Sequence, residues 1–139
     1  MPHILIVEDE PTTSWALAEG LSDDGYTIDT FRTAEEALAW LRAHRSDLVI
    51  TDFRLPGLSG LELAQKLSRG RSAQPVIVVT AYGSPETVRE LVRAGVSEVF
   101  PKPFHVDELR RAVHRALLAR TERRSARSAR GSSSLRRAA

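Results

Sequence analysis

Short apolar runs recur along the chain and are separated by segments with helical spacing. Four runs are continuously apolar, which is typical of parallel strands covered on both faces: residues 4–7, 48–50, 76–79 and 99–100. A fifth run, residues 26–31, mixes polar and apolar side chains and predicts an edge strand. The pattern therefore predicts a sheet of four buried strands and one strand at its edge.

Helix signals fill the gaps between these runs. Two capping-box patterns and one Ser-Pro pair predict helix starts: Thr33 with Glu36, Ser59 with Glu62, and Ser84 with Pro85. The last helix takes its apolar face from Val106, Leu109, Val113 and Leu117. Strand and helix thus alternate five times, which predicts a doubly wound α/β fold with helices on both faces of a parallel sheet. In such folds the ligand site lies at the carboxyl ends of the strands.

The composition agrees with one domain that has a single core. The chain has 139 residues, of which 42% are hydrophobic, and it contains no Cys. Disulfides and thiolate metal sites are therefore excluded. No apolar run approaches the ~20 residues of a membrane span, and acidic residues follow the first run immediately. We expect a cytoplasmic protein with no membrane partner.

Charge is distributed unevenly along the chain. The formal net charge is +2, but residues 121–139 contain six Arg and one Glu, so the preceding part is acidic. We predict one folded domain over residues 1–120, followed over 121–139 by a basic Arg/Ser-rich tail or truncated linker that is largely disordered. Nucleic acid would be a partner only through this tail or through a further effector domain.

Chemically active side chains follow the predicted strands. Glu8 and Asp9 follow the first, Asp52 the third, Thr80 the fourth and Lys102 the last. Any one of them alone is most simply a loop or capping residue, but their joint placement at one sheet edge favours a functional site. Clustered carboxylates repel one another unless a cation enters, and Mg²⁺ suits carboxylate and phosphate oxygens. Asp52 is then a candidate nucleophile for a phosphoryl group.

These motifs identify a resemblance to a known family. Over residues 3–119 the chain resembles the receiver domain of bacterial response regulators, on the motifs VEDE at 7–10, DFRLPGLSG at 52–60, TAY at 80–82 and KPF at 102–104. The resemblance implies a flavodoxin-like sheet with strand order 2-1-3-4-5. It also implies that a sensor histidine kinase or phosphotransfer protein phosphorylates Asp52, a signalling step rather than the turnover of an enzyme.

The resemblance also assigns roles to the other site residues. It implies that Mg²⁺ is bound by Glu8, Asp9, Asp52 and the backbone carbonyl of Arg54. Thr80 and Lys102 would bind the phosphoryl oxygens. Arg54 and Tyr82 would flank the path of attacking water, and the Lys102–Pro103 bond is a candidate cis peptide.

One position departs from the family pattern. Many receivers carry an aromatic residue three positions before the lysine, where this chain has Val99 and places Phe100 one position later. Neighbouring strand residues face opposite sides of a sheet, so we predict that Phe100 packs in the core instead. A homodimer through the face of the fourth helix, the last strand and the last helix is a further implication of the resemblance.

Two other functions compete with a free-standing phosphorylation switch. The chain could be the N-terminal input half of a longer DNA-binding transcriptional regulator. It could also be a metal-dependent phosphohydrolase that forms an aspartyl phosphate. Hydrolases of that class place a second aspartate two residues after the nucleophile, where this chain has Arg54, so the sequence argues against that alternative.

Overall fold

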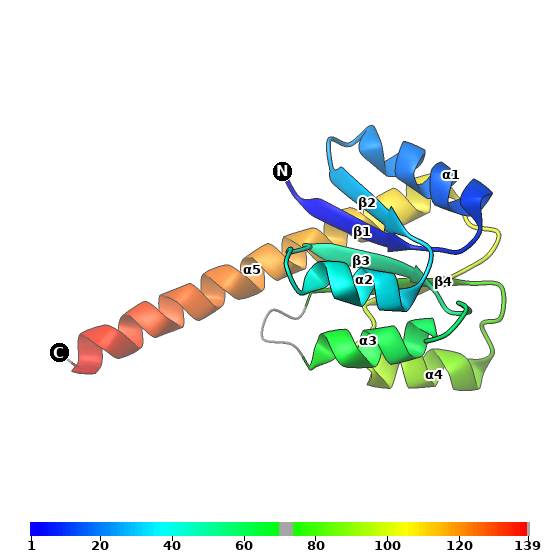
Figure 1. The fold of residues 1–139 in the computed structure, drawn as a ribbon. Helices are drawn as coiled ribbons and strands as arrows, with labels where there is room; N and C mark the ends of the chain where they lie inside the picture. Colours follow the sequence, from blue (N-terminus) through cyan, green and yellow to red (C-terminus); the bar gives the residue numbers. More distant parts are fainter. Residues whose placement is uncertain (70–73, 139) are drawn as a thin grey trace.

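Five parallel strands form one sheet in the order β2-β1-β3-β4-β5 (Figure 1). The computed structural model describes residues 1–69 and 74–138, and only the backbone of Arg127 and of residues 130–138. The strands are β1 (His3–Val7), β2 (Thr27–Phe31), β3 (Leu48–Asp52), β4 (Val76–Thr80) and β5 (Glu98–Pro101). The predicted fold class and strand order are confirmed.

Five helices cover the two faces of this sheet. They are α1 (Pro11–Ser22), α2 (Ala34–Leu41), α3 (Gly60–Ser68), α4 (Pro85–Arg93) and α5 (Val106–Ala138). Successive side chains of a strand point to opposite faces, so β1 supplies both halves of the core. Ile4 and Ile6 belong to the cluster that α1 and α5 complete, whereas Leu5 and Val7 belong to the cluster that α2, α3 and α4 complete. The buried strands are therefore apolar without a break, as the sequence indicated.

The predicted helix starts are found where capping residues stand. Ser59 forms a full capping box with Glu62, in which each side chain bonds the other residue's backbone N–H. The Thr33 hydroxyl accepts a hydrogen bond from the Glu36 backbone N–H at 3.1 Å, which is half of the box that the sequence predicted there. Ser84 caps α4. These caps fix where each helix begins at the carboxyl edge of the sheet.

The two consecutive residues Val99 and Phe100 of β5 pack on opposite faces. Val99 contacts the cluster on the side of α4, and Phe100 contacts the cluster on the side of α1 and α5. Phe100 is half-buried and packs against that core cluster, which agrees with the prediction that it is a packing residue, since strand neighbours alternate. The ring therefore lies away from the layer that contains α4.

Helix α5 continues beyond the body of the domain (Figure 1). Its last buried residue is Arg120 in the part whose side chains are described, and residues 121–126 are all exposed. The sequence predicted disorder for most of 121–139, whereas the structure continues the helix through Ala138. The Ala and Arg residues of this segment favour a helix, and the GSSS stretch at 131–134 does not. The division at residue 120 itself stays a prediction.

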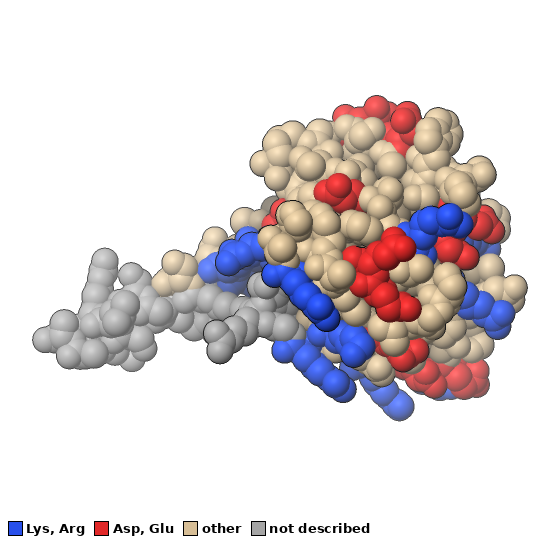
Figure 2. Space-filling model, in the orientation of Figure 1, with Lys and Arg blue, Asp and Glu red and all other residues tan. Residues whose placement is uncertain are grey.

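Positive charge gathers where α5 leaves the body (Figure 2). Arg45, Lys66 and Arg120 line a cavity of about 160 Å³ there, and Arg120 donates a hydrogen bond to the Ser46 carbonyl oxygen at 3.0 Å. This edge carries the start of β3, opposite the edge where the strands end. None of the described helices is long and apolar enough to span a bilayer.

Candidate functional site

The carboxyl ends of β1 and β3 bring three acidic residues together. The two strands are paired, with Val7 opposite Thr51, so the residues that follow them lie side by side. Glu8, Asp9 and Asp52 each offer a carboxylate oxygen, and these oxygens lie within 4.8 Å of one another. Glu8 is buried, and the other two are half-buried. The structure therefore brings together the acidic residues that the sequence singled out.

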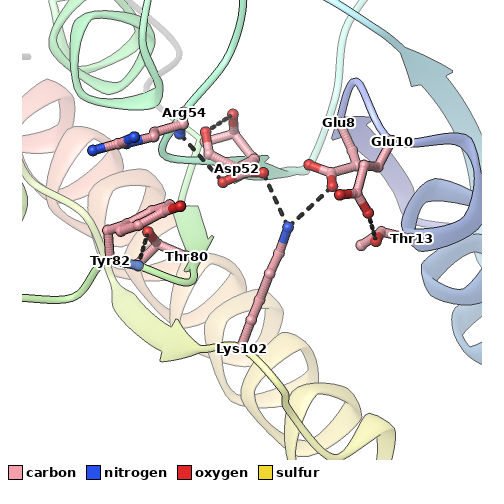
Figure 3. A network of polar contacts seen from close by, with 9 residues as sticks. Glu8, Glu10, Thr13, Asp52, Arg54, Thr80, Tyr82 and Lys102 are labelled. Atoms are coloured by element: carbon pink, nitrogen blue, oxygen red, sulfur yellow. Dashed lines mark hydrogen bonds and ion pairs between the residues drawn. The ribbon is translucent and has the colours of Figure 1, made fainter.

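Lys102 reaches this acidic cluster from the end of β5 (Figure 3). Its Nζ donates to Asp52 Oδ2 at 3.0 Å and to Glu8 Oε1 at 3.1 Å. Its backbone N–H donates to the Thr80 carbonyl oxygen at 2.8 Å, which fixes the start of the side chain next to β4. The Lys102–Pro103 peptide bond is cis, as the sequence indicated. One ammonium group thus bridges two carboxylates that are 44 residues apart in the chain.

Burial and neighbouring charges shift the pKa values of Glu8 and Lys102. Burial raises the pKa of Glu8 to about 8, and its proximity to Asp52 acts in the same direction, while Lys102 lowers that pKa only in part. Burial alone would lower the pKa of Lys102, but its hydrogen bonds to Asp52 and Glu8 raise it overall. Lys102 is therefore firmly charged, and the cluster still has capacity for a second cation.

Thr80 ends β4 and is completely buried. Its Oγ1 accepts a hydrogen bond from the backbone N–H of Tyr82 at 3.0 Å. Among the described residues no hydrogen bond uses the proton of this hydroxyl. A hydroxyl can accept and donate at once, so Thr80 keeps one donor for a further partner.

Arg54 and Tyr82 form a stack beside Asp52 (Figure 3). The Arg54 guanidinium carbon lies 3.9 Å from the centroid of the Tyr82 ring, and the Arg54 backbone N–H donates to Asp52 Oδ1 at 3.2 Å. The stack joins the loop after β3 to the loop after β4. The two residues that the resemblance placed beside the path of water therefore contact each other directly.

Two features near the site had no signal in the sequence. A groove of about 380 Å³ opens beside Glu8 and Asp9, and the exposed Trp15 forms part of its wall. On the other side, Glu35 accepts a hydrogen bond from the Leu58 backbone N–H at 3.2 Å. Both depend on helices that reach the site only in the folded chain, so no spacing along the sequence could reveal them.

The chain belongs to the response regulator receiver domain family, whose model matches residues 4–114. The nitrogen assimilation regulatory protein NtrX of Azorhizobium caulinodans is 39% identical over 120 residues, which cover 84% of this chain and 26% of NtrX. The transcriptional regulatory protein TcrA of Mycobacterium tuberculosis is 37% identical over 107 residues, covering 77% of this chain and 42% of TcrA.

A solved structure shares the whole architecture. A CheY-like response regulator receiver domain protein from Methanospirillum hungatei superposes with a TM-score of 0.84 at 28% identity, covering 88% of this chain and 98% of that chain. The chain is therefore a receiver domain of two-component systems, a signalling module. It spans less than half of the length of the regulators NtrX and TcrA.

Proposed function

We propose that Asp52 accepts a phosphoryl group from a sensor histidine kinase or a phosphotransfer protein. The observation that carries this proposal is the contact of Lys102 Nζ with Asp52 Oδ2 at 3.0 Å, inside a cluster of three carboxylates. A half-buried ammonium beside the Asp52 carboxylate prepares that position for a dianionic group. The family of the chain supports the same reading.

The transfer uses one oxygen of the Asp52 carboxylate as the nucleophile. That oxygen attacks the phosphorus of the donor's phosphohistidine, the new O–P bond forms, and the N–P bond breaks. The electron pair of the broken bond stays on the imidazole nitrogen of the donor. We assign Lys102 and the free donor of Thr80 to the phosphoryl oxygens, where charge-assisted hydrogen bonds stabilise the product.

The acidic cluster is a suitable site for Mg²⁺. Glu8, Asp9 and Asp52 supply hard oxygen ligands within 4.8 Å of one another, and we assign the Arg54 backbone carbonyl as the fourth protein ligand. Burial raises the pKa of Glu8, the proximity of Asp52 adds to this, and Lys102 offsets the two effects only in part. When bound, Mg²⁺ neutralises charge between the carboxylates and the incoming phosphoryl oxygens.

The module acts as a switch rather than as an enzyme in this proposal, because it catalyses only its own phosphorylation and dephosphorylation.

A second candidate function has a specific observation in its favour. The DNA-binding transcriptional regulator NtrC of Salmonella typhimurium is 32% identical, and the chain covers 24% of it. The chain would then be the input half of a longer DNA-binding regulator. Dimerisation through the face of α4, β5 and α5, contact of the tail with nucleic acid, and the cytoplasm as compartment stay predictions.

Intact-mass measurement after incubation with acetyl phosphate and Mg²⁺ tests the proposal. The parent chain should gain one phosphoryl group, and EDTA should abolish the gain because the carboxylates then repel the donor. Asp52→Asn should gain none, while Asp23→Asn, which changes an exposed residue at the end of α1, should behave like the parent. A phosphoryl group on Asp52→Asn would overturn the assignment.

A further inference from the structure

The loop between β3 and α3 passes beside the first turn of α2. Glu35 lies in that turn, and its Oε1 accepts the hydrogen bond from the Leu58 backbone N–H at 3.2 Å. Its Oε2 lies against Gly57, so closely that a β carbon at this position would overlap it. Gly57 also has a φ of +78°, a backbone conformation that glycine adopts at little cost. The carboxylate of Glu35 therefore contacts two consecutive loop residues.

Both ends of this loop are held independently of Glu35. At the β3 end, the Arg54 backbone N–H donates to Asp52 Oδ1. At the α3 end, the capping box of Ser59 and a hydrogen bond from the Gly60 N–H to the Phe53 carbonyl oxygen fix the chain. For residues 55–58, the described part of the structure shows one backbone hydrogen bond, the bond to Glu35. Glu35 thus holds Gly57 and Leu58, the two loop residues just before the N-cap of α3.

The path of the loop determines where the Arg54 carbonyl points. Arg54 lies only three residues before Gly57, so fixing Gly57 and Leu58 restricts the backbone torsions open to residues 55 and 56, and with them the direction of the Arg54 carbonyl. Mg²⁺ requires nearly ideal octahedral geometry and tolerates small ligand displacements poorly. A group that fixes the loop will therefore change how tightly the site binds the ion, although it lies outside the acidic cluster itself.

We propose that Glu35 is a positioning residue for the magnesium site, which holds the β3–α3 loop in the path that presents the Arg54 carbonyl to the ion. This inference rests on the proposed function, because it takes that carbonyl as a metal ligand. The negative charge of Glu35 is itself favoured in the first turn of a helix, where the backbone N–H groups point outwards. A charged acceptor also makes a stronger hydrogen bond to Leu58 than a neutral one.

Isothermal titration with Mg²⁺ of the parent chain and three variants tests the proposal. Glu35→Ala removes the acceptor, and we expect its Kd for Mg²⁺ to rise about three- to tenfold, the equivalent of one hydrogen bond. Glu35→Gln retains a carbonyl oxygen and should stay within about twofold of the parent. Glu36→Ala is the matched control, because Glu36 is exposed in the same turn and contributes only its backbone N–H to the Thr33 cap. It should leave the Kd unchanged.

The Mg²⁺ dependence of the phosphorylation rate distinguishes a positioning role of Glu35 from a loss of folded protein. With acetyl phosphate as donor, Glu35→Ala should need more Mg²⁺ for half-maximal phosphorylation, but its rate at saturating Mg²⁺ should return to that of the parent. Melting temperatures in EDTA show whether the variant is folded at the temperature of the titration. An unchanged Kd in Glu35→Ala, or an equal weakening in Glu36→Ala, would overturn the inference. If the parent itself bound no Mg²⁺, the proposed function would fail instead.

Discussion

Raising the pH in the absence of divalent metal should destabilise the domain through Glu8. The carboxyl group of Glu8 has a pKa of about 8 in the folded chain, against 4.5 for an ordinary glutamate. Between these two values the folded state holds one proton more than the unfolded state. The free energy of unfolding must therefore fall as the pH rises through this window, and the stabilising contribution is complete only below the lower value.

The size of the effect follows from the linkage relation. One proton corresponds to about 1.4 kcal/mol per pH unit, so the free energy of unfolding should drop by about 2.5 kcal/mol from roughly pH 5.5 to 7.5. For a domain of this size, such a loss lowers the melting temperature by about 8 °C. Added Mg²⁺ should reverse the trend, because the ion binds the deprotonated carboxylate and releases the proton.

Urea unfolding in EDTA at the two pH values measures this effect, and Glu8→Gln is the control. The variant keeps the shape of the side chain but cannot titrate, so its free energy of unfolding should lack the fall that Glu8 causes. A fall of the same size in Glu8→Gln would assign the proton to another group. A parent chain that became more stable as the pH rose would contradict the sign of the argument.

Three further predictions concern Lys102, Thr80 and the Arg54–Tyr82 stack. Lys102→Met should abolish phosphorylation and lower the melting temperature in EDTA, because two carboxylates lose their bridging cation. Mg²⁺ should restore most of that stability, and a variant that melts far below the parent even with Mg²⁺ would show a mainly structural role. Thr80→Ala should retain phosphorylation but lose the backbone amide shifts that beryllofluoride causes in residues 81–89, whereas Thr80→Ser, which keeps the hydroxyl donor, should retain them. Shifts of parental size in Thr80→Ala would exclude a role of this hydroxyl in the rearrangement. A double-mutant cycle on Arg54→Ala and Tyr82→Ala, measured by urea unfolding, should give a coupling of about 0.5 kcal/mol, and additive effects would show that the stack contributes nothing in solution.

Most of the fold could be predicted from the sequence because burial and strand alternation are local signals. Continuous apolar runs marked the inner strands, and capping residues marked the starts of α2, α3 and α4. The predicted runs were shorter than the strands at β1, β3, β4 and β5, and at β5 Glu98 and Pro101 extend the strand on both sides of its apolar pair. Glu98 and Pro101 add nothing to a pattern of apolar residues, so the pattern could not locate the two ends of β5.

The site could be predicted in composition but not in geometry. Parallel strands end at the same edge of a sheet, and this rule predicted that Glu8, Asp52 and Lys102 lie close together. The partner of Thr80 and the contact of Glu35 with the β3–α3 loop were missed, because each depends on how a loop turns in three dimensions. The tail beyond residue 120 is a different case, because its predicted disorder stays a prediction. Its composition resembles a solvated linker, while the helix propensity of Ala and Arg favours a continuous helix.

Because α5 is long, a small change in its tilt would move its far end over a large distance. Its 33 residues extend about 50 Å at a rise of ~1.5 Å per residue, and the part beyond Arg120 accounts for about 27 Å of that length. The helix is fixed to the body at Arg120, which bonds the Ser46 carbonyl oxygen next to the start of β3. A tilt of about 10° at this pivot would displace the far end by about 5 Å, since a continuous helix bends little over such a length. A rearrangement too small to alter the core would thus move the end of the helix by roughly the 4.8 Å distance between two neighbouring strands.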